Sequence, residues 1–474
     1  PVSTFNSIRT SHYTNETLKQ YNLGDGSSIY TPQSGKSESS LNSLIARVNY
    51  TFLKRYNATT TLRADNSSRF AAHHRWGYFP SLGLSWNIDR EPFLQGKLSW
   101  LDNLKLRASA GMVGNQEISD YNFSTSYSTG SYNGTSSYAK STSVNDNLKW
   151  ETTASYNIGL DAGLFDERLN IVLDAYYKKT SDLLLNVPVG FSSGVTTQLQ
   201  NVGNVINRGI EFTVDGTLIK HRNISWDANA TFATNHNEIT SMGTASDIIL
   251  GDANQQILRK GESLGSFYGL QFAGIVQKGT DVSKLPTING KTPSAGDAIF
   301  VDTNHDHKID ANDRVVLGSV QPAFTYGFGS QVKWNRFDAS IAFSGSYGNK
   351  LYNALGRRLE QTGDSYNVLT TILNAWTPEN ASNTLALPST TRPFSYIDSR
   401  YVQSASYLKL RNLTIGYQLS LPKDFHAKIR IALTGSNLLT FSPYKGFDPE
   451  VASGTDNGAY PASRSFVLSA NITF

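Results

Sequence analysis

One short segment of the sequence carries oxygen-bearing side chains at a spacing that suits a metal ion. In VDTNHDHKIDANDR these side chains fall at positions 1, 3, 5, 9 and 12 of an EF-hand-like loop, with a backbone carbonyl at position 7. Hard oxygen ligands at this spacing wrap a Ca²⁺ ion. The predicted ligands are therefore Asp302, Asn304, Asp306, the carbonyl of Lys308, Asp310 and Asp313.

Two departures from the EF-hand pattern leave other interpretations open. Position 6 is His307, where glycine normally supplies the sharp turn, and a left-handed non-glycine residue costs about 1–2 kcal/mol. Position 12 is Asp313, which is shorter than the usual bidentate glutamate. The segment is thus also compatible with an Asp/Asn-rich turn that holds no ion, or with a site for Mg²⁺ or another ion.

Signatures of catalysis are missing from the sequence. It contains no GxSxG, HExxH, Walker A or dinucleotide-binding glycine motif. His73 and His74 are adjacent, so on a strand they would point to opposite faces and make poor co-ligands. With Arg69 and Arg75 they fit a solvated loop rim. We therefore expect a protein that is not an enzyme.

The composition indicates a surface that does not face water alone. Charged residues make up 17% of the chain, against about 25% in a typical soluble protein. Ser, Thr, Asn and Gly fill the deficit, together with 24 Tyr, 23 Phe and 7 Trp. The net charge is only +4 and no basic run is interleaved with aromatic residues, so we expect no nucleic-acid partner.

Several other classes are excluded by what the sequence lacks. It has no cysteine, so it forms no disulfide framework, thiolate metal site or cysteine nucleophile. No apolar stretch approaches the ~20 residues of a membrane-spanning helix. The first residues, PVSTFNSIRT, lack signal-peptide architecture, so we expect the start of a processed or truncated chain.

Apolar and polar residues alternate along many segments, which predicts β-strands with two unlike faces. Many of these segments are longer than the about 5–6 residues typical of strands in soluble proteins. Long alternating strands with aromatic residues near their ends are typical of a membrane barrel with an apolar band of ~25 Å. Examples are NIVLDAYYKKT at 170–180, RGIEFTVDGTL at 208–218, RFDASIAFSGS at 336–346 and RSFVLSANITF at 464–474.

The connections between these strands alternate between very short and very long. Outer-membrane barrels have this asymmetry, with tight periplasmic turns and long extracellular loops. We therefore predict an all-β fold, a transmembrane antiparallel β-barrel. The short connections are Lys54–Tyr56, Phe165–Arg168, Lys220–Asn223, Trp334–Arg336 and Pro422–Asp424, and the long ones lie near 112–147, 180–207, 236–322, 348–405 and 440–463.

These patterns divide the chain into two parts. Residues 1–40 are expected to form an extracellular loop with an irregular start, and residues 41–474 the barrel portion. If the segment GSFYGLQFAGIV (265–276) spanned the membrane, short and long connections would no longer alternate. We therefore expect this segment in an extracellular hairpin. This hairpin and the metal loop at 302–313 both fall within the 236–322 excursion.

The direction of the strands predicts that part of the barrel is missing. The strands near 44–54 and 464–474 both run toward the short-turn side, which implies an odd number of spanning strands, about 13. Single-chain bacterial barrels have even numbers of strands, and an open edge in hydrocarbon costs several kcal/mol for each unpaired backbone group. We therefore expect the final strand, at 464–474, to pair with a first strand in a missing N-terminal part.

Nine segments in succession resemble the SusC/RagA family of TonB-dependent outer-membrane transporters. Their order and spacing match the C-terminal half of that family's barrel over nearly the whole chain. The segments are ARVNYTFLKRYNATTTLRADNSSRF, RWGYFPSLGLSW, LDNLKLRASAGMVGNQ, NLKWETTASYNIGLDAGLFDERLNIVLDAYYKKTSDLLL, NVGNVINRGIEF, FVDTNHDHKIDANDR, YLKLRNLTIGYQL, GFDPEV and YPASRSFVLSANITF.

The resemblance implies a barrel of 22 strands, of which this chain would supply about 13. It implies a plug domain and a TonB box, both absent from this chain, and a SusD-like surface lipoprotein that lids the barrel. The implied function is TonB-dependent import of oligosaccharides or oligopeptides across the outer membrane of a Gram-negative bacterium. Phe474 matches the aromatic terminus that the family presents to the barrel-assembly machinery.

The remaining candidate groups have plain structural explanations in a barrel. Asp215 and Asp227 could serve acid–base chemistry, but a polar barrel interior explains them better. Loop aromatic residues could stack on sugars or peptide side chains, although loop packing and the interfacial girdle are favoured for any single one. These residues are Tyr121, Phe123, Tyr127, Tyr132 and Tyr138.

Two other functions stay open at the level of sequence. The first is a passive porin or adhesin barrel, which would lack the plug. The second is a soluble β-rich carbohydrate-binding protein, against which the sorting of loops by length argues.

Overall fold

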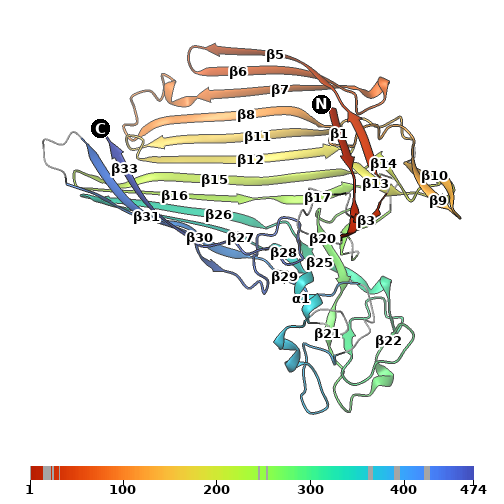
Figure 1. Cartoon of the computed structure of the whole chain (residues 1–474). Coiled ribbons are helices and arrows are strands. Elements are labelled where there is room, and N and C mark those ends of the chain that lie inside the picture. The colour runs from red at the N-terminus through yellow and green to blue at the C-terminus, as the bar shows by residue number, and fades with distance from the viewer. Residues whose placement is uncertain are drawn as a thin grey trace.

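The computed structural model is dominated by one antiparallel β-sheet (Figure 1). The structure describes residues 2–13, 23, 26–30, 32–142, 144–243, 246–251, 253, 255–360, 367–388, 396–420 and 427–474. The sheet has 14 strands, and one of them, β17 (His236–Ser241), pairs with β15 off the main path. The main path consists of β5 (Leu41–Phe52), β6 (Tyr56–Ser67), β7 (Trp76–Asn87), β8 (Leu101–Asn115), β11 (Glu151–Leu164), β12 (Leu169–Ser181), β15 (Asn204–His221), β16 (Ile224–Thr234), β26 (Phe324–Trp334), β27 (Phe337–Tyr347), β30 (Tyr407–Gln418), β31 (Lys428–Phe441) and β33 (Ser465–Thr473).

The order of these strands confirms the predicted fold class. Each spanning strand lies beside the one before it in the chain, and every pair is antiparallel. The main path therefore holds thirteen strands, the number predicted. β5 and β33 are its two ends, and each has one neighbour among the described residues.

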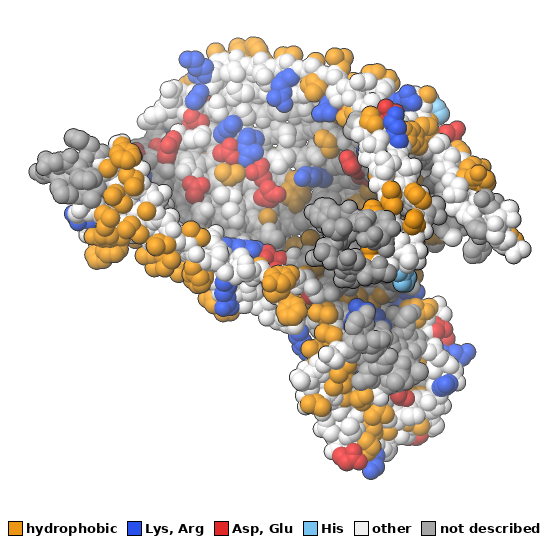
Figure 2. All heavy atoms as spheres, in the orientation of Figure 1, with side chains coloured by type: hydrophobic (Ala, Val, Ile, Leu, Met, Phe, Trp, Pro, Cys, Tyr) orange, Lys and Arg blue, Asp and Glu red, His pale blue; other side chains and the backbone are white. Residues whose placement is uncertain are grey.

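The two faces of the sheet differ in chemistry, as the alternation predicts. On β11, Tyr156, Ile158 and Leu160 are exposed on one face. Ile158 lies opposite Ala108 of β8 and Ala175 of β12, so this face stays apolar across neighbouring strands. Figure 2 shows the other side, where charged side chains gather in the hollow of the sheet while apolar ones line the outer edge.

Short turns gather at one end of the sheet and long excursions at the other (Figure 1). The β5–β6 turn places Leu53 and Lys54 at φ of 51° and 59°, the left-handed geometry of a tight hairpin turn. The short turns predicted at Phe165–Arg168, Lys220–Asn223 and Trp334–Arg336 are also present, and they occupy 165–168, 222–223 and 335–336. The predicted turn at Pro422–Asp424 lies outside the described residues.

The start of the chain is more regular than expected. Residues 1–40 were expected to be irregular, but two small antiparallel sheets lie there. One pairs β1 (Val2–Ser7) with β4 (Gln33–Glu38), and the other pairs β2 (Thr10–Tyr13) with β3 (Gly26–Ile29). These strands are short and rich in Ser and Thr, so they lack the apolar alternation that predicts a strand.

The segment at 265–276 lies outside the large sheet, as predicted, and its first half belongs to a hairpin with the preceding strand. It contains β20 (Ser266–Leu270) and β21 (Phe272–Ile275), which belong to different sheets. β20 pairs with β19 (Gln256–Leu258) and with β25 (Arg314–Ser319). All five residues of β20 are buried, so its sequence carries no alternation from which its partners can be predicted.

The remaining long excursions fold into small sheets and a lobe with its own apolar core. The core of the lobe joins residues 270–309 to Trp376 and is formed by Leu270, Ile275, Ala298, Phe300, Ile309 and Trp376. The smaller pairs are β9 (Ser126–Tyr132) with β10 (Thr135–Thr142), β13 (Leu184–Pro188) with β14 (Thr197–Asn201), β18 (Ile248–Leu250) with β19, β21 with β23 (Ala298–Phe300), β22 (Thr287–Ile288) with β24 (Lys308–Ile309), and β28 (Lys350–Asn353) with both β29 (Val402–Ser404) and β32 (Thr455–Asp456).

Helices are short in the part of the chain that the structure describes. The α-helix α1 (Ala354–Leu359) follows β28 directly. No described helix is long and apolar enough to cross a membrane.

Candidate functional site

The hollow of the sheet is lined by ion pairs between strands, and Arg107 of β8 forms the largest group. Its Nε and Nη2 donate to Asp161 of β11 at distances down to 2.7 Å, and its Nη1 and Nη2 donate to Asp174 of β12 at 3.0 and 2.9 Å. Gly159 lies between them, where a Cβ would come within 2.3 Å of Asp174 Oδ1 and 2.6 Å of Arg107 Nη2. Glycine at this position therefore makes room for the guanidinium group.

Similar pairs fix other parts of the same face. Arg63 holds Asp65 through Nε at 2.7 Å, and Arg430 of β31 donates to Asp338 of β27. Such paired charges give a polar wall without leaving an isolated ion. Ser155 of β11 lines an open cavity of about 690 Å³ on this wall, between β5 and β11.

The predicted acidic pair Asp215 and Asp227 lines this wall as well. Both lie on a cavity of about 370 Å³ near the short-turn end of the sheet. Asp215 accepts a hydrogen bond from Asn170 at 3.1 Å, and Asp227 accepts one from Thr217 at 2.7 Å. Each carboxylate thus has a neutral partner on its own or a neighbouring strand, which fits a lining residue.

The two adjacent histidines lie in the connection between β6 and β7, which agrees with the predicted loop rim. They belong to a 3-10 turn (Ala72–His74), and their ring centroids are 4.3 Å apart. Arg69 nearby pairs with Asp120 at 3.1 Å. The turn brings the rings of His73 and His74 together because successive residues of a 3-10 helix do not alternate between faces as strand residues do.

The first half of the predicted metal loop forms a tight turn. Asp302 accepts backbone hydrogen bonds from Asp306 at 3.3 Å and His307 at 2.8 Å, and Asn304 accepts one from Asp306 at 3.1 Å. His307 has φ of 62°, the left-handed geometry predicted for position 6. Asp306 in turn accepts from the backbone of Lys308 at 2.9 Å. Asp302, Asn304 and Asp306 are therefore brought together.

The second half of the loop uses its carboxylates as helix caps. Asp313 is fully buried and accepts backbone hydrogen bonds from Thr303 and Asp310, both at 2.8 Å. Asp310 caps the short 3-10 helix by accepting from Asn312 at 2.7 Å. In the described residues, no three His, Cys, Asp or Glu side chains meet as a metal-ligand group. All the predicted ligand atoms are oxygens, as Ca²⁺ prefers, but both oxygens of Asp313 already accept hydrogen bonds from backbone amides.

The loop aromatic residues divide into two kinds. Tyr127, Tyr132 and Tyr138 are 65%, 81% and 75% exposed on the β9–β10 pair. Phe123 instead packs against the apolar cluster that contains Phe70 and Trp150. Exposure of the three tyrosines leaves their rings free to stack on another molecule, whereas Phe123 serves packing.

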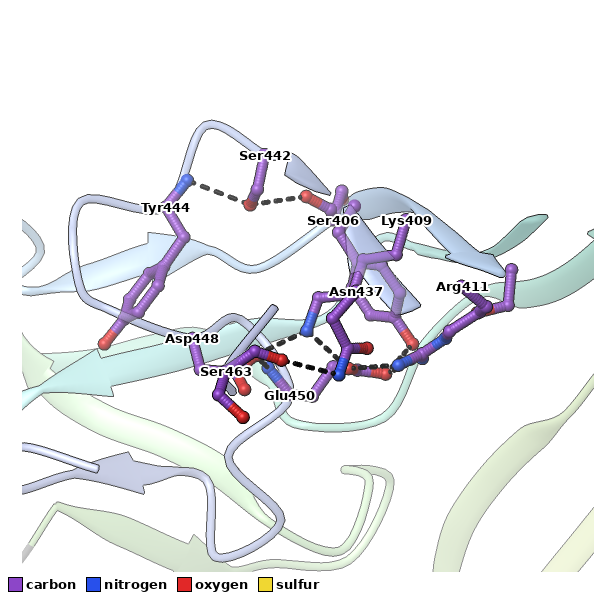
Figure 3. Close-up of polar contacts among 11 residues, drawn as sticks. Ser406, Lys409, Arg411, Asn437, Ser442, Tyr444, Asp448, Glu450 and Ser463 are labelled. Carbon is purple, nitrogen blue, oxygen red and sulfur yellow. Dashed lines mark hydrogen bonds and ion pairs between the residues drawn. The ribbon is translucent and has the colours of Figure 1, made fainter. Parts of the chain in front are cut away.

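A charged cluster at the loop end of β30 was not identified from the sequence (Figure 3). We call it the β30 cluster, and it consists of Tyr407, Lys409 and Arg411 on β30 with Asp448 and Glu450 in the excursion at 442–464. Lys409 Nζ donates to Asp448 at 2.8 Å and to Glu450 at 2.5 Å. Arg411 donates to both oxygens of Glu450, one of them at 2.9 Å, and Tyr407 donates to Glu450 at 2.6 Å.

The environment of Glu450 keeps it ionised. Burial by itself raises its pKa, but hydrogen bonds from Arg411, Lys409 and Tyr407 outweigh burial and hold the pKa at about 2. Lys409 is only 5% exposed, so this cation depends on its two carboxylate partners. The sequence signal for the cluster was Tyr, Lys and Arg at alternate positions of YLKLRN and two acids in GFDPEV.

Comparison with known proteins agrees with this architecture. Residues 3–438 match the family model described as TonB dependent receptor-like, beta-barrel. TonB-dependent receptor P3 of Formosa agariphila is 34% identical over 98% of this chain and 48% of its own length. TonB-dependent receptor SusC of Bacteroides thetaiotaomicron is 32% identical over 91% of this chain and 43% of its own.

A solved structure gives the same result at the level of the fold. The structure of the RagAB peptide transporter superposes with a TM-score of 0.81 and 28% identity, over 97% of this chain and 50% of that chain. The chain thus spans about half the length of the relatives it matches. The relatives are receptors and transporters rather than enzymes. On these grounds the chain belongs to the TonB-dependent receptor β-barrel family, among relatives of the SusC and RagA type.

Proposed function

We propose that this chain forms part of the barrel wall of a TonB-dependent transporter that imports oligosaccharides or oligopeptides. The observation that carries the proposal is the division of the thirteen-strand path into an apolar face and an ion-paired face. A lipid-facing exterior and a polar passage require this division. The ion pairs of Arg107, Asp161 and Asp174 would line the passage.

The proposed location is the outer membrane of a Gram-negative bacterium. The apolar face would contact lipid, the short turns would lie on the periplasmic side and the long excursions on the outside. Residues 1–40 would form part of this extracellular surface and residues 41–474 the C-terminal portion of the barrel.

The proposed partners are of three kinds. The rest of the transporter would supply the remaining strands and a plug, since the relatives are about twice as long as this chain. The TonB complex would supply energy, and a SusD-like surface lipoprotein would lid the long excursions. Oligopeptides are a candidate substrate because the RagAB relative is described as a peptide transporter.

Uptake by intact cells tests this proposal. Cells with and without the gene would be given labelled oligopeptides or oligosaccharides, with and without an uncoupler of the proton-motive force. Uptake that needs both the gene and the proton-motive force is expected. Gene-dependent uptake that survives the uncoupler would indicate a passive porin, and the lack of any gene-dependent uptake would indicate an adhesin.

We also propose that the loop at 302–313 holds Ca²⁺ and orders its excursion. Asp302, Asn304, Asp306, the carbonyl of Lys308, Asp310 and Asp313 would bind the ion, and the turn at His307 already has the required backbone geometry. The full transporter should melt at a higher temperature in Ca²⁺ than in a chelator. Asp302→Ala should remove this difference, and Asp281→Asn, in the same excursion, should keep it.

Three outcomes separate the alternatives for this loop. A stabilisation by Mg²⁺ that equals that by Ca²⁺ would assign a less selective site. The absence of any metal-dependent shift in the parent protein would contradict the metal proposal. An Asp302→Ala protein that still responds to Ca²⁺ would place the ion elsewhere.

A further inference from the structure

The last long excursion, residues 442–464, is tied to the barrel wall at its beginning, middle and end (Figure 3). At its beginning, Ser442 donates to the carbonyl of Ser406 at 2.8 Å. In its middle, Asp448 and Glu450 join the β30 cluster. At its end, Asn437 of β31 donates to the carbonyl of Ser463 at 3.2 Å. An excursion with three such ties is fixed to the wall rather than free above it.

Irregularities in β30 and β31 set the positions of the residues that form these ties. Against β27, the register shifts between Leu410 and Asn412 and leaves Arg411 as the extra residue of a bulge. Against β31, the extra residue lies on β31, where residues 437 and 438 face Arg411. Opposite it, Asn437 adopts φ of 54°. A bulge re-aims a side chain, and here it leaves Arg411 in contact with the same carboxylate, Glu450, as Lys409.

The same excursion also carries a strand that completes another sheet. β32 pairs in parallel with β28, and the amide of Tyr352 donates to the carbonyl of Gly454 at 2.9 Å. Asp456 of β32 is fully buried and accepts hydrogen bonds from Tyr444 Oη and from the amide of Gly458, both at 2.8 Å. Since β28 also pairs with β29, both strands of the excursion at 348–406 belong to this sheet, and β28 lies between β29 and β32.

Contacts with the 236–322 excursion complete this arrangement. Thr455 accepts a hydrogen bond from Gln255 at 3.4 Å. Gly454 has φ of 75°, and a Cβ there would come within 2.4 Å of Val320. Residues 448–456 thus contact the wall and the excursions at 236–322 and 348–406.

The β30 cluster is not itself suited to a charged ligand. Its two cations, Lys409 and Arg411, face two carboxylates, and Glu450 is bonded to three donors. A ligand would have to break these pairs in a partly buried place. The cluster is therefore better explained as a fixed internal tie.

We propose that residues 442–464, which we call the keystone segment, position the neighbouring long excursions of this protein. The β30 cluster is the contact that fixes this segment to the barrel wall. Through the cluster, the barrel wall sets the position of β32, and β32 sets the positions of β28, β29 and the neighbouring excursions. Lys409, Arg411 and Glu450 are then positioning residues for the surface that these excursions present. The role of that surface in capturing substrate or a lipoprotein rests on the proposed function, whereas the positioning of the excursions by residues 442–464 does not.

Amide hydrogen exchange of the detergent-solubilised full transporter tests the role of the keystone segment. Glu450→Gln should raise exchange in 446–456 and also in the distant segments 350–353 and 402–404, by about tenfold or more. Asp456→Asn should raise exchange in 350–353 while 448–450 stays protected, because Asp456 supports β32 and takes no part in the β30 cluster. Asp281→Asn, which breaks an exposed pair with Lys284, is the matched control and should change neither region.

Folding of the barrel is checked separately, by the heat-dependent change in gel mobility of each variant. If Glu450→Gln keeps an intact barrel and increases exchange only within 442–464, the proposal that this segment positions the neighbouring excursions is overturned. Unchanged exchange in all segments would overturn the proposal that the β30 cluster fixes residues 442–464 to the barrel wall. If Glu450→Gln prevents barrel assembly, the Asp456→Asn result decides, since unchanged exchange in 350–353 would then refute the proposal.

Co-purification and uptake separate this inference from the proposed function. A parent transporter that takes up no substrate and captures no lipoprotein would contradict the function while the exchange pattern stands. Conversely, a normal parent transporter whose Glu450→Gln variant keeps the neighbouring excursions protected would contradict only the role of the keystone segment. Reduced lipoprotein capture by Glu450→Gln, without loss of the barrel, is the expected functional consequence.

Discussion

At the scale of single residues, an ion-pair group of the polar wall depends on a glycine, whose missing side chain leaves space for an arginine. Arg107 reaches two carboxylates on two neighbouring strands because Gly159 leaves the space between them open. Gly83, on β7, has no heavy atom within 4 Å of the place where its Cβ would be. The two glycines therefore form a matched pair, one required by packing and one not.

Gly159→Ala is expected to destabilise the barrel by about 1–3 kcal/mol, the usual cost of overpacking. Gly83→Ala should be neutral or slightly stabilising, because alanine loses less backbone entropy than glycine on folding. The temperature at which gel mobility changes on heating measures both. Equal temperatures for the two variants would show that Arg107 can move aside without loss.

At the same scale, local chemistry was predictable and distant pairing was not. The left-handed turn at His307 follows from six consecutive residues, so the sequence predicts it and the structure confirms it. The partners of Arg107 lie 54 and 67 positions away, and those of Lys409 lie 39 and 41 away. Such pairs depend on strand register and bulges, which alternation alone does not determine.

At the scale of elements, spanning strands were predictable because each has one apolar and one polar face. The partners of β20 are not predictable because both of its faces are buried, and the strands in 1–40 are not predictable because neither of their faces is apolar. The sequence predicts only a long loop near 440–463, although Asp448, Glu450 and Asp456 make the excursion at 442–464 a structural element.

The tie between this excursion and β30 should weaken only below about pH 4.5. The pKa of Glu450 is lowered from 4.5 to about 2 in the folded protein, so its contribution is fully present above pH 4.5 and is lost as the pH falls toward 2. Allowing for screening by water, this contribution is on the order of 2 kcal/mol. Protection of 446–456 in the parent protein should thus be constant from about pH 8 to 5.

Comparison with Glu450→Gln gives the sign of this dependence. The ratio of protection factors between parent and variant should be large at neutral pH and should shrink as the pH falls below about 4.5. Dividing the two values at each pH removes the intrinsic acid and base dependence of exchange. A ratio that already falls between pH 8 and 6 would assign the tie to a different titrating group.

At the scale of the whole molecule, the two faces of the sheet expose different kinds of side chain. Ile158 lies near the middle of β11 on the apolar face and is 55% exposed. Ser155, on the same strand, faces the cavity of about 690 Å³ on the polar wall. Lysine at these two positions adds the same charge to the same strand, but to opposite faces.

Ile158→Lys is expected to destabilise the barrel in lipid by about 2–4 kcal/mol, the cost of a lysine near the bilayer midplane. Ser155→Lys should cost much less, because its ammonium group can enter an open cavity whose lining includes the carboxylates of Asp65 and Glu117. Urea-induced unfolding in lipid vesicles measures the difference, and abundance in the outer membrane gives an independent check. Equal losses in both variants would mean that the apolar face does not contact hydrocarbon, and a greater loss for Ser155→Lys would reverse the assignment of the two faces.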